Sequence, residues 1–174
     1  DENGIEHPLD AGVQKIVTLT NKWALLKELS NFEKKIAIIL YNYPPGKAEM
    51  GASYLDVFQS LHDLLTKLKY EGYDLGTEEI PTPNQLYTLV AEFGNKGSWA
   101  QPRLDQYVNK YRDKLQINGQ LVDPSTYLSW FNQLPAVLQQ QVIEKWGNAL
   151  GDIMVSSGSI VIPGIMFGNV FITV

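Results

Sequence analysis

The stretch "KKIAIILYNYPPGKAEMGASYLDVFQSL", residues 34–61, decides how this chain folds. It starts with an uninterrupted apolar run at residues 35–41, which favours a strand buried on both faces of a parallel sheet with flanking helices. A loop containing two prolines and two glycines follows, and after it comes an apolar pattern at helical spacing. A strand, a loop and a helix in this order predict an α/β unit.

The helix of this unit is predicted to open at Ser53 and to end at Gly72. The Ser53 hydroxyl can cap free backbone N–H groups, and Asp56 adds negative charge near the positive end of the helix. One face of the helix carries six apolar side chains, which we assign to the core: Tyr54, Val57, Phe58, Leu61, Leu65 and Leu68.

Other helices are predicted on both sides of this unit. Residues 12–30 carry apolar side chains at three- and four-residue steps, namely Ile16, Leu19, Trp23 and Leu26. "Thr82-Pro83-Asn84-Gln85" is a helix start in which the glutamine can reach back to the first backbone N–H groups. Helices are therefore expected at residues 12–30, 82–93, 102–116, 123–131 and 135–147.

The last residues change character. "SIVIPGIMFGNVFITV", residues 159–174, is β-branched and aromatic and predicts two strands joined by a turn at Gly168-Asn169, with Pro163 at an edge or a bulge. The whole pattern predicts one α/β domain over residues 1–174. It has a Rossmann-like, partly parallel sheet with flanking helices, a helix-rich middle segment and C-terminal β strands; residues 82–147 are a possible helical insertion.

Composition narrows the classes of function. A chain of 174 residues with 44% hydrophobic residues can fold without a metal or a disulfide. The net charge of −5, without a basic block, argues against nucleic acid as a partner, and the longest apolar stretches are too short to span a bilayer. The absence of cysteine excludes a thiolate metal site and a cysteine nucleophile. Because the chain lacks an initial methionine and stops inside an apparent strand, we expect a fragment of a longer protein.

The proline- and glycine-containing loop is a poor phosphate cradle. Gly46 and Gly51 have the separation found in a Walker A loop, and Ser53 occupies the hydroxyl position. However, Ala52 stands where that motif needs the lysine that neutralises the terminal phosphates. A nucleotide site is therefore not supported.

The length of the loop indicates contact with a ligand or a protein, although a plain structural connection stays possible. It takes eleven residues from Asn42 to Ala52, whereas strand-to-helix loops usually take about two to six. A long loop at the carboxyl end of a parallel strand lies where α/β sheets bind ligands. Tyr43 offers a ring face there, and Lys47 could meet a carboxylate.

Three stretches together resemble the large subunit shared by cobaltochelatase and magnesium chelatase. They are "KKIAIILYNYPPGKAEMGASYLDVFQSLHDLLTKLKYEGYDL" at residues 34–75, "WFNQLPAVLQQQVIEKWG" at 130–147 and "IPGIMFGNVFITV" at 162–174. They occur in the order found in the family, and the cobaltochelatase branch looks closer than the magnesium branch.

The resemblance implies a cytoplasmic protein that binds a tetrapyrrole and a divalent metal substrate, cobalt or magnesium. Two smaller partner subunits, a ring-forming ATPase and a middle subunit, would supply the energy of ATP for metal insertion in cobalamin or (bacterio)chlorophyll biosynthesis. Family members are several times longer than this chain, and their histidine- and glycine-rich motif lies beyond the last matching stretch. The parent protein would thus be a ligase that forms nitrogen–metal bonds, whereas this fragment alone is expected to be inactive and to bind no cofactor.

The remaining candidates are weaker. His62 could be a metal ligand or a proton carrier, but a partly buried packing role is the simpler interpretation, and Glu78-Glu79 fits a solvated surface. No catalytic residue and no metal ligand is predicted. The expected substrate-binding residues are Asn42, Tyr43, Gly46, Lys47, Gly51 and Asn169; the alternative is a structural or subunit-docking domain without a ligand.

Overall fold

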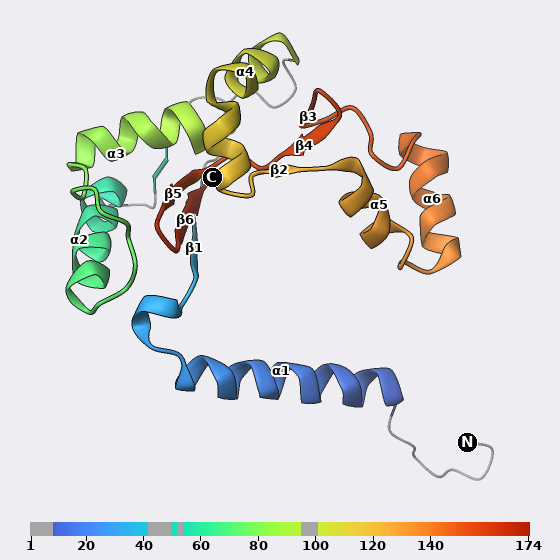
Figure 1. The fold of residues 1–174 in the computed structure, drawn as a ribbon, viewed down its shortest axis with the longest axis horizontal. Helices are drawn as coiled ribbons and strands as arrows, with labels where there is room; N and C mark the ends of the chain where they lie inside the picture. The colour runs from blue at the N-terminus through green and yellow to red at the C-terminus, as the bar shows by residue number, and fades with distance from the viewer. Residues whose placement is uncertain (1–8, 42–49, 52–53, 95–100) are drawn as a thin grey trace.

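A computed structural model of the chain describes residues 9–41, 50–51, 54–94 and 101–174. Helices and two small sheets alternate along it, which confirms the predicted α/β class (Figure 1). The helices are α1 (Asp10–Glu28), the 3-10 turn η1 (Asn31–Glu33), α2 (Val57–Tyr70), α3 (Pro83–Leu89), the π-helical turn η2 (Val90–Gly94), α4 (Gln101–Ile117), α5 (Pro124–Phe131) and α6 (Ala136–Trp146). The strands are β1 (Ile36–Ile39), β2 (Leu121–Val122), β3 (Val155–Ser156), β4 (Ser159–Val161), β5 (Ile165–Phe167) and β6 (Val170–Thr173).

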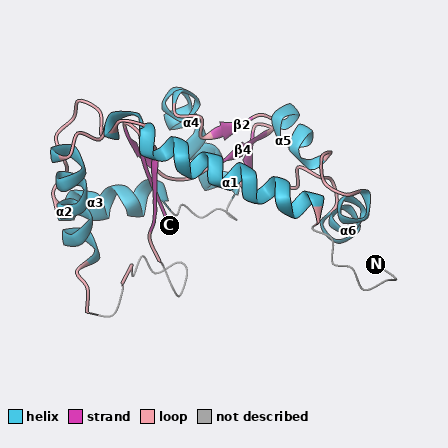
Figure 2. Ribbon diagram, turned by 90° about the horizontal axis from the view of Figure 1, so that it is seen from below, coloured by secondary structure: helices cyan, strands magenta, loops and turns pink. Residues whose placement is uncertain are grey.

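The first sheet has the order β1-β6-β5 and joins the two ends of the described chain. β1 pairs with β6 in parallel, and β6 pairs with β5 in an antiparallel hairpin that turns at Gly168-Asn169, as predicted. α2 and α3 lie on one side of this sheet (Figures 1 and 2). The core between the helices and the strands consists of Leu61, Leu65, Leu75, Leu86, Val90, Ile165, Phe167, Val170 and Ile172.

The expectation that β1 is covered on both faces is wrong for the described chain. Ile36 and Ile38 pack against the core, whereas Ala37 and Ile39 are exposed, Ile39 at 75%. The reason is that α2 and α3 cover only one face of the sheet, so the apolar side chains on the other face have no neighbouring layer.

The start of α2 also differs from the prediction. Its first residue is Val57, and Asp56 is the cap, with Oδ1 accepting a hydrogen bond of 3.0 Å from the Gln59 backbone N–H. Ser53 lies outside the described residues, and Tyr54, which was expected in the buried stripe, is fully exposed. The cap of α2 is thus a carboxylate directly before the apolar run.

The predicted end of α2 is confirmed. Gly72 has a φ of +80°, and the backbone N–H of Tyr73 donates to the carbonyl of Leu68 at 3.0 Å. This six-residue closure is a Schellman ending, which favours glycine in the left-handed conformation.

The start of α3 matches the sequence signal as well. Thr82 and Gln85 form the predicted capping box: the Thr82 backbone N–H donates to Gln85 Oε1 at 2.9 Å. α5 and α6 also lie where they were expected, α5 with Asp123 as its cap. Residues 95–100, which lie between the helices predicted at 82–93 and 102–116, are outside the described residues.

A second sheet, β2-β4-β3, was not predicted. Its strands have only two or three residues, too few to show a period in the sequence. Together with α4 it encloses a second core of Leu104, Tyr107, Val108, Leu115 and Val161.

Gln120 connects the two sheets. Its buried side chain donates from Nε2 to the carbonyl oxygens of Ile162 at 2.9 Å and of Gly164 at 3.1 Å. Pro163, expected at an edge or a bulge, lies in this link and belongs to neither adjacent strand. Whether residues 82–147 are an insertion stays a prediction.

Candidate functional site

The carboxyl end of β1 is the place where the sequence predicts a ligand. β1 and β6 run in parallel to this end, and the Leu40 backbone N–H donates to the Thr173 carbonyl at 2.8 Å. Tyr41 follows with an exposed ring, and on the far side of the loop Met50 packs against the core under α2 and α3. Four of the predicted binding residues lie outside the described residues: Asn42, Tyr43, Gly46 and Lys47.

Gly51 is exposed, and a Cβ added to it would meet no atom within 4 Å. Its position therefore imposes no close approach of another part of the described chain. A role of Gly51 in shaping the loop stays a prediction.

Asn169 lies at the opposite end of the same pair of strands. Its backbone carbonyl accepts from the Ile36 N–H at 3.0 Å, and its side-chain Nδ2 donates to the Phe32 carbonyl at 3.0 Å. Tyr41 follows Ile36 by five positions, which corresponds to about 17 Å along an extended strand. The structure thus separates Asn169 from the point where the predicted binding loop begins.

A hollow of about 280 Å³ lies beside Asn169, on the face of the sheet opposite α2 and α3. Its polar groups come from Lys35 and Asn169, and its apolar floor comes from alternate residues of the three strands. The full lining is Lys35, Ile36, Ala37, Met166, Asn169 and Phe171.

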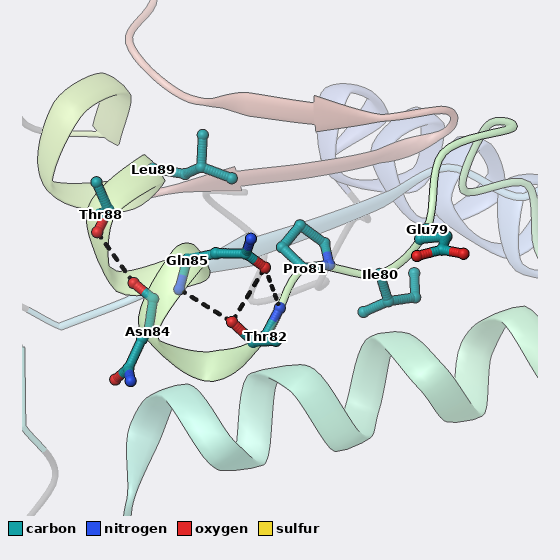
Figure 3. A pocket seen from close by; sticks show the side chains of 8 residues that line it. All are labelled: Glu79, Ile80, Pro81, Thr82, Asn84, Gln85, Thr88 and Leu89. Atoms are coloured by element: carbon teal, nitrogen blue, oxygen red, sulfur yellow. Dashed lines mark hydrogen bonds between the residues drawn. The ribbon is translucent and has the colours of Figure 1, made fainter.

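Another hollow, of about 780 Å³, borders the start of α3 (Figure 3). Three of its polar side chains are engaged with their own helix: Thr82 and Gln85 bond each other, and Thr88 Oγ1 donates to the Asn84 carbonyl at 3.0 Å. Its one charged lining residue is Glu79. The hollow therefore offers no positive charge to an acidic ligand.

His62 lies close to this hollow but serves the packing of the chain. The half-buried ring donates from Nδ1 to the Pro81 carbonyl at 2.9 Å, because a carbonyl can only accept. In the part of the chain that the structure describes, no three histidine, aspartate or glutamate side chains converge as metal ligands would. These contacts support the packing interpretation of His62.

An aromatic cluster between the two cores was missed by the sequence. The rings of Phe93, Tyr107 and Tyr111 lie with centroids 4.8 to 5.9 Å apart. Two irregular segments meet there, the π-helical turn η2 and a kink in α4 at Tyr111, whose φ of −120° and ψ of 16° are not helical. The sequence had predicted only a helix over residues 102–116.

Tyr107 is the unusual member of this cluster. Its hydroxyl is buried and has no hydrogen-bond partner among the described residues. Burial raises the pKa of Tyr107 to about 12, with smaller contributions from Tyr111 and Glu92. The ring also lines a cavity of about 60 Å³ at the seam between the two cores.

Comparison with known proteins decides the family. The sequence model of the CobN/Magnesium Chelatase family matches residues 1–174, the whole chain. The chain belongs to this family. The resemblance found in the three sequence stretches is thereby confirmed.

Curated relatives agree with this membership. An uncharacterized protein of Methanocaldococcus jannaschii is 34% identical over 92% of the chain, and magnesium-chelatase subunit ChlH of Oryza sativa subsp. indica is 28% identical over 98%. The aerobic cobaltochelatase subunit CobN of Sinorhizobium sp. is 24% identical over 95%. Both branches are represented, so a closer relation to the cobaltochelatase branch stays a prediction.

The chain covers only 11–12% of the length of these three relatives. Among solved structures, the catalytic subunit of cobaltochelatase from Mycobacterium tuberculosis matches 85% of the chain and 11% of its own length, with a TM-score of 0.55 and 22% identity. This likeness supports the fold. None of the described helices combines the length and the hydrophobicity needed to cross a membrane.

Proposed function

We propose that this chain is a segment of the large subunit of a cobalt- or magnesium-chelatase and contributes to the site that binds the tetrapyrrole. The observation that carries the proposal is the family match over residues 1–174. Relatives named as magnesium-chelatase and cobaltochelatase subunits match more than nine-tenths of the chain.

The ligand contact proposed for this segment is the loop of residues 42–52. The parallel pairing of β1 with β6 supports this location, because α/β sheets bind ligands beyond the carboxyl ends of parallel strands. In the proposal the Tyr43 ring stacks on the macrocycle and the Lys47 ammonium meets a peripheral carboxylate, while Gly46 and Gly51 shape the loop. These roles rest on the sequence.

The chemistry explains why a segment without metal ligands can still matter. Metal insertion requires that the pyrrole nitrogens lose their protons and that the metal substrate sheds its water shell, so the macrocycle must be held in one position. A loop that fixes the ring and one carboxylate restricts its orientation. The energy of ATP would come through partner subunits, an ATPase and a middle subunit.

A titration of the chain with a porphyrin carboxylic acid or a corrinoid acid tests the proposal. We expect a saturable change in ligand absorbance, and about three- to tenfold weaker binding for Lys47→Ala, because a charge-assisted hydrogen bond is lost. Lys145→Ala on α6 is the matched control. It removes the same charge, but outside the loop of residues 42–52, and binding should therefore be unchanged. ATP with magnesium should not raise the melting temperature, since Ala52 replaces the Walker lysine.

The competing function is a scaffold or subunit-docking segment without its own ligand. The large apolar side chains exposed on α1, α5 and α6 favour this alternative. Absence of any absorbance change with the unmutated chain would support it.

A further inference from the structure

We propose that another segment of the large chelatase subunit packs on two apolar surfaces of this chain. The first, the α1 stripe, consists of Val13, Ile16, Leu19, Trp23 and Leu26; the second, the open sheet face, consists of Ala37, Ile39, Met166 and Phe171. The inference rests on the part of the proposed function that makes this chain one segment of a larger subunit, and it is independent of tetrapyrrole binding.

The α1 stripe follows the helical period but meets no core. Its members recur every three or four residues, and none of the residues of α1 is buried. Ile16 is 66% and Trp23 68% exposed, whereas Gln14 and Asn21 lie on the opposite side of the helix. Because helices of this length draw most of their stability from packing, a stripe of this width indicates a missing partner.

The open sheet face is the second surface without a covering layer: Ala37 and Ile39 are exposed, and Met166 and Phe171 are half-buried. Ala37, Phe171 and Met166 form one row across the three strands, and Ile39 lies two residues along β1 from Ala37. The hollow of about 280 Å³ described above lies over this row. Parallel α/β sheets are normally covered on both faces, so this surface is also incomplete.

The elements that carry the two surfaces lie on the same side of α2 and α3. α2 and α3 lie on one side of the first sheet, and α1 extends away on the other side, along the long axis (Figures 1 and 2). One apolar segment inserted there could therefore contact both.

The length of the relatives identifies the occupant. The chain corresponds to only 11–12% of the three relatives compared above, so most of a large subunit lies outside it. A segment in the same polypeptide is held at high effective concentration, which favours it over a second copy or a separate subunit. Because the five side chains of the α1 stripe are uncharged, the segment that covers them should present an apolar face.

Thiol labelling tests the proposal in the intact large subunit, purified without tetrapyrrole. This chain contains no cysteine, so Trp23→Cys, Ile16→Cys and Ile39→Cys each add one thiol to it, and Asn21→Cys on the polar side of α1 is the matched control. Maleimide modification is followed by peptide mass spectrometry in the intact subunit and in the 174-residue chain alone. We expect the three apolar positions to react at least about tenfold more slowly than Asn21→Cys in the intact subunit, and at a similar rate in the chain alone.

Three results would overturn the proposal. Equal rates at all four positions in the intact subunit would show that nothing covers these surfaces. Protection in the chain alone would mean that α1 closes on its own sheet if the protection is independent of concentration, and that a second copy binds if it grows with concentration. Because Ile16→Cys and Trp23→Cys probe the same stripe, a folding defect in one variant leaves the other as the test.

Discussion

Gly168 lies in the turn of the β5–β6 hairpin. Its φ is +51°, and a Cβ there would lie 2.5 Å from the Gly76 nitrogen and 2.6 Å from Asp74 Oδ1. The segment of Asp74 therefore supports the β5–β6 hairpin: the Asn169 N–H donates to the Asp74 carbonyl at 2.9 Å. A side chain at residue 168 would push these backbones apart.

We predict that Gly168→Ala lowers the free energy of unfolding by about 2–4 kcal/mol, because left-handed strain adds to overpacking. Gly72→Ala is the control, since its φ is +80° but a Cβ would meet no atom within 4 Å. It should cost only about 1 kcal/mol. Urea unfolding measures both values, and equal losses would show that Gly168 is selected by its conformation alone.

Substitution by phenylalanine is predicted to change the free energy of unfolding in opposite directions at Tyr107 and Tyr111. The Tyr107 hydroxyl has no partner among the described residues, so Tyr107→Phe should raise the free energy of unfolding by up to about 1 kcal/mol. The Tyr111 hydroxyl donates to Glu92 Oε1 at 3.0 Å, so Tyr111→Phe should lower it by about 1–2 kcal/mol. Chemical denaturation of both variants measures these changes. A clear decrease in the free energy of unfolding for Tyr107→Phe would show that the Tyr107 hydroxyl binds a water or another partner.

Because of Tyr107, the free energy of unfolding should also change at alkaline pH. In the folded chain its pKa is raised to about 12, whereas the unfolded chain titrates near 10. The unfolded state therefore loses its proton first, and the free energy of unfolding should fall as the pH rises from 10 to 12. The fall should be smaller in Tyr107→Phe, and an identical pH profile for the two proteins would contradict the assignment.

At the scale of elements, sequence signals located helices wherever a local cap and a stop were present. Thr82 with Gln85, Asp123 and Gly72 each mark a boundary that depends on neighbours within a few residues. The start of α2 was misplaced because two capping residues, Ser53 and Asp56, compete within one turn.

The short strands could not be predicted for a different reason. β3 and β4 form a hairpin with only two paired positions, and β2 pairs with β4, a partner that lies more than thirty residues away along the chain. The spacing of apolar residues within one segment does not show which distant segment it pairs with. The uncovered face of β1 was missed similarly, since an apolar run shows that a strand can be buried, not which layers are present.

The cap of α5 is a testable example at this scale. Asp123 accepts hydrogen bonds from the Thr126 backbone N–H at 2.9 Å and from the hydroxyls of Ser125 and Thr126 at 2.5 Å each. These bonds hold the pKa of the Asp123 carboxyl well below its usual range, and the bond from Ser125 contributes most. The cap thus acts mainly in its ionised form.

We predict that Asp123→Ala lowers the free energy of unfolding by about 0.5–2 kcal/mol, whereas Asp123→Ser retains most of the cap. Because the folded-state pKa is depressed, the contribution is present above about pH 4 and is lost as the pH falls below that value. Denaturation at pH 7 and at pH 3 tests this: the difference between Asp123→Ala and the unmutated chain should shrink at pH 3, and a constant difference would contradict the charge argument.

At the scale of the whole molecule, the two cores form a unit that is closed on one side and open on the other. α2 and α3 seal one face of the first sheet, and α4 with the second sheet forms the neighbouring core. The opposite face and α1 lack a covering layer, which is consistent with a chain that spans about a tenth of its relatives.

The candidate site was predictable only in part. The sequence placed a long loop at the carboxyl end of a parallel strand, and the pairing of β1 with β6 confirms that topology. It could not show that Asn169 lies at the other end of those strands, because that depends on the register between segments 130 residues apart. The binding roles of Tyr43 and Lys47 stay predictions.

Hydrogen exchange of the large subunit in the presence of tetrapyrrole tests the central claim most directly. With a saturating porphyrin or corrinoid acid, amide exchange in peptides that cover residues 42–52 should slow at least about tenfold, while peptides from α6 should not change. Saturation with ligand but unchanged exchange throughout residues 42–52 would contradict the claim that this loop contacts the macrocycle.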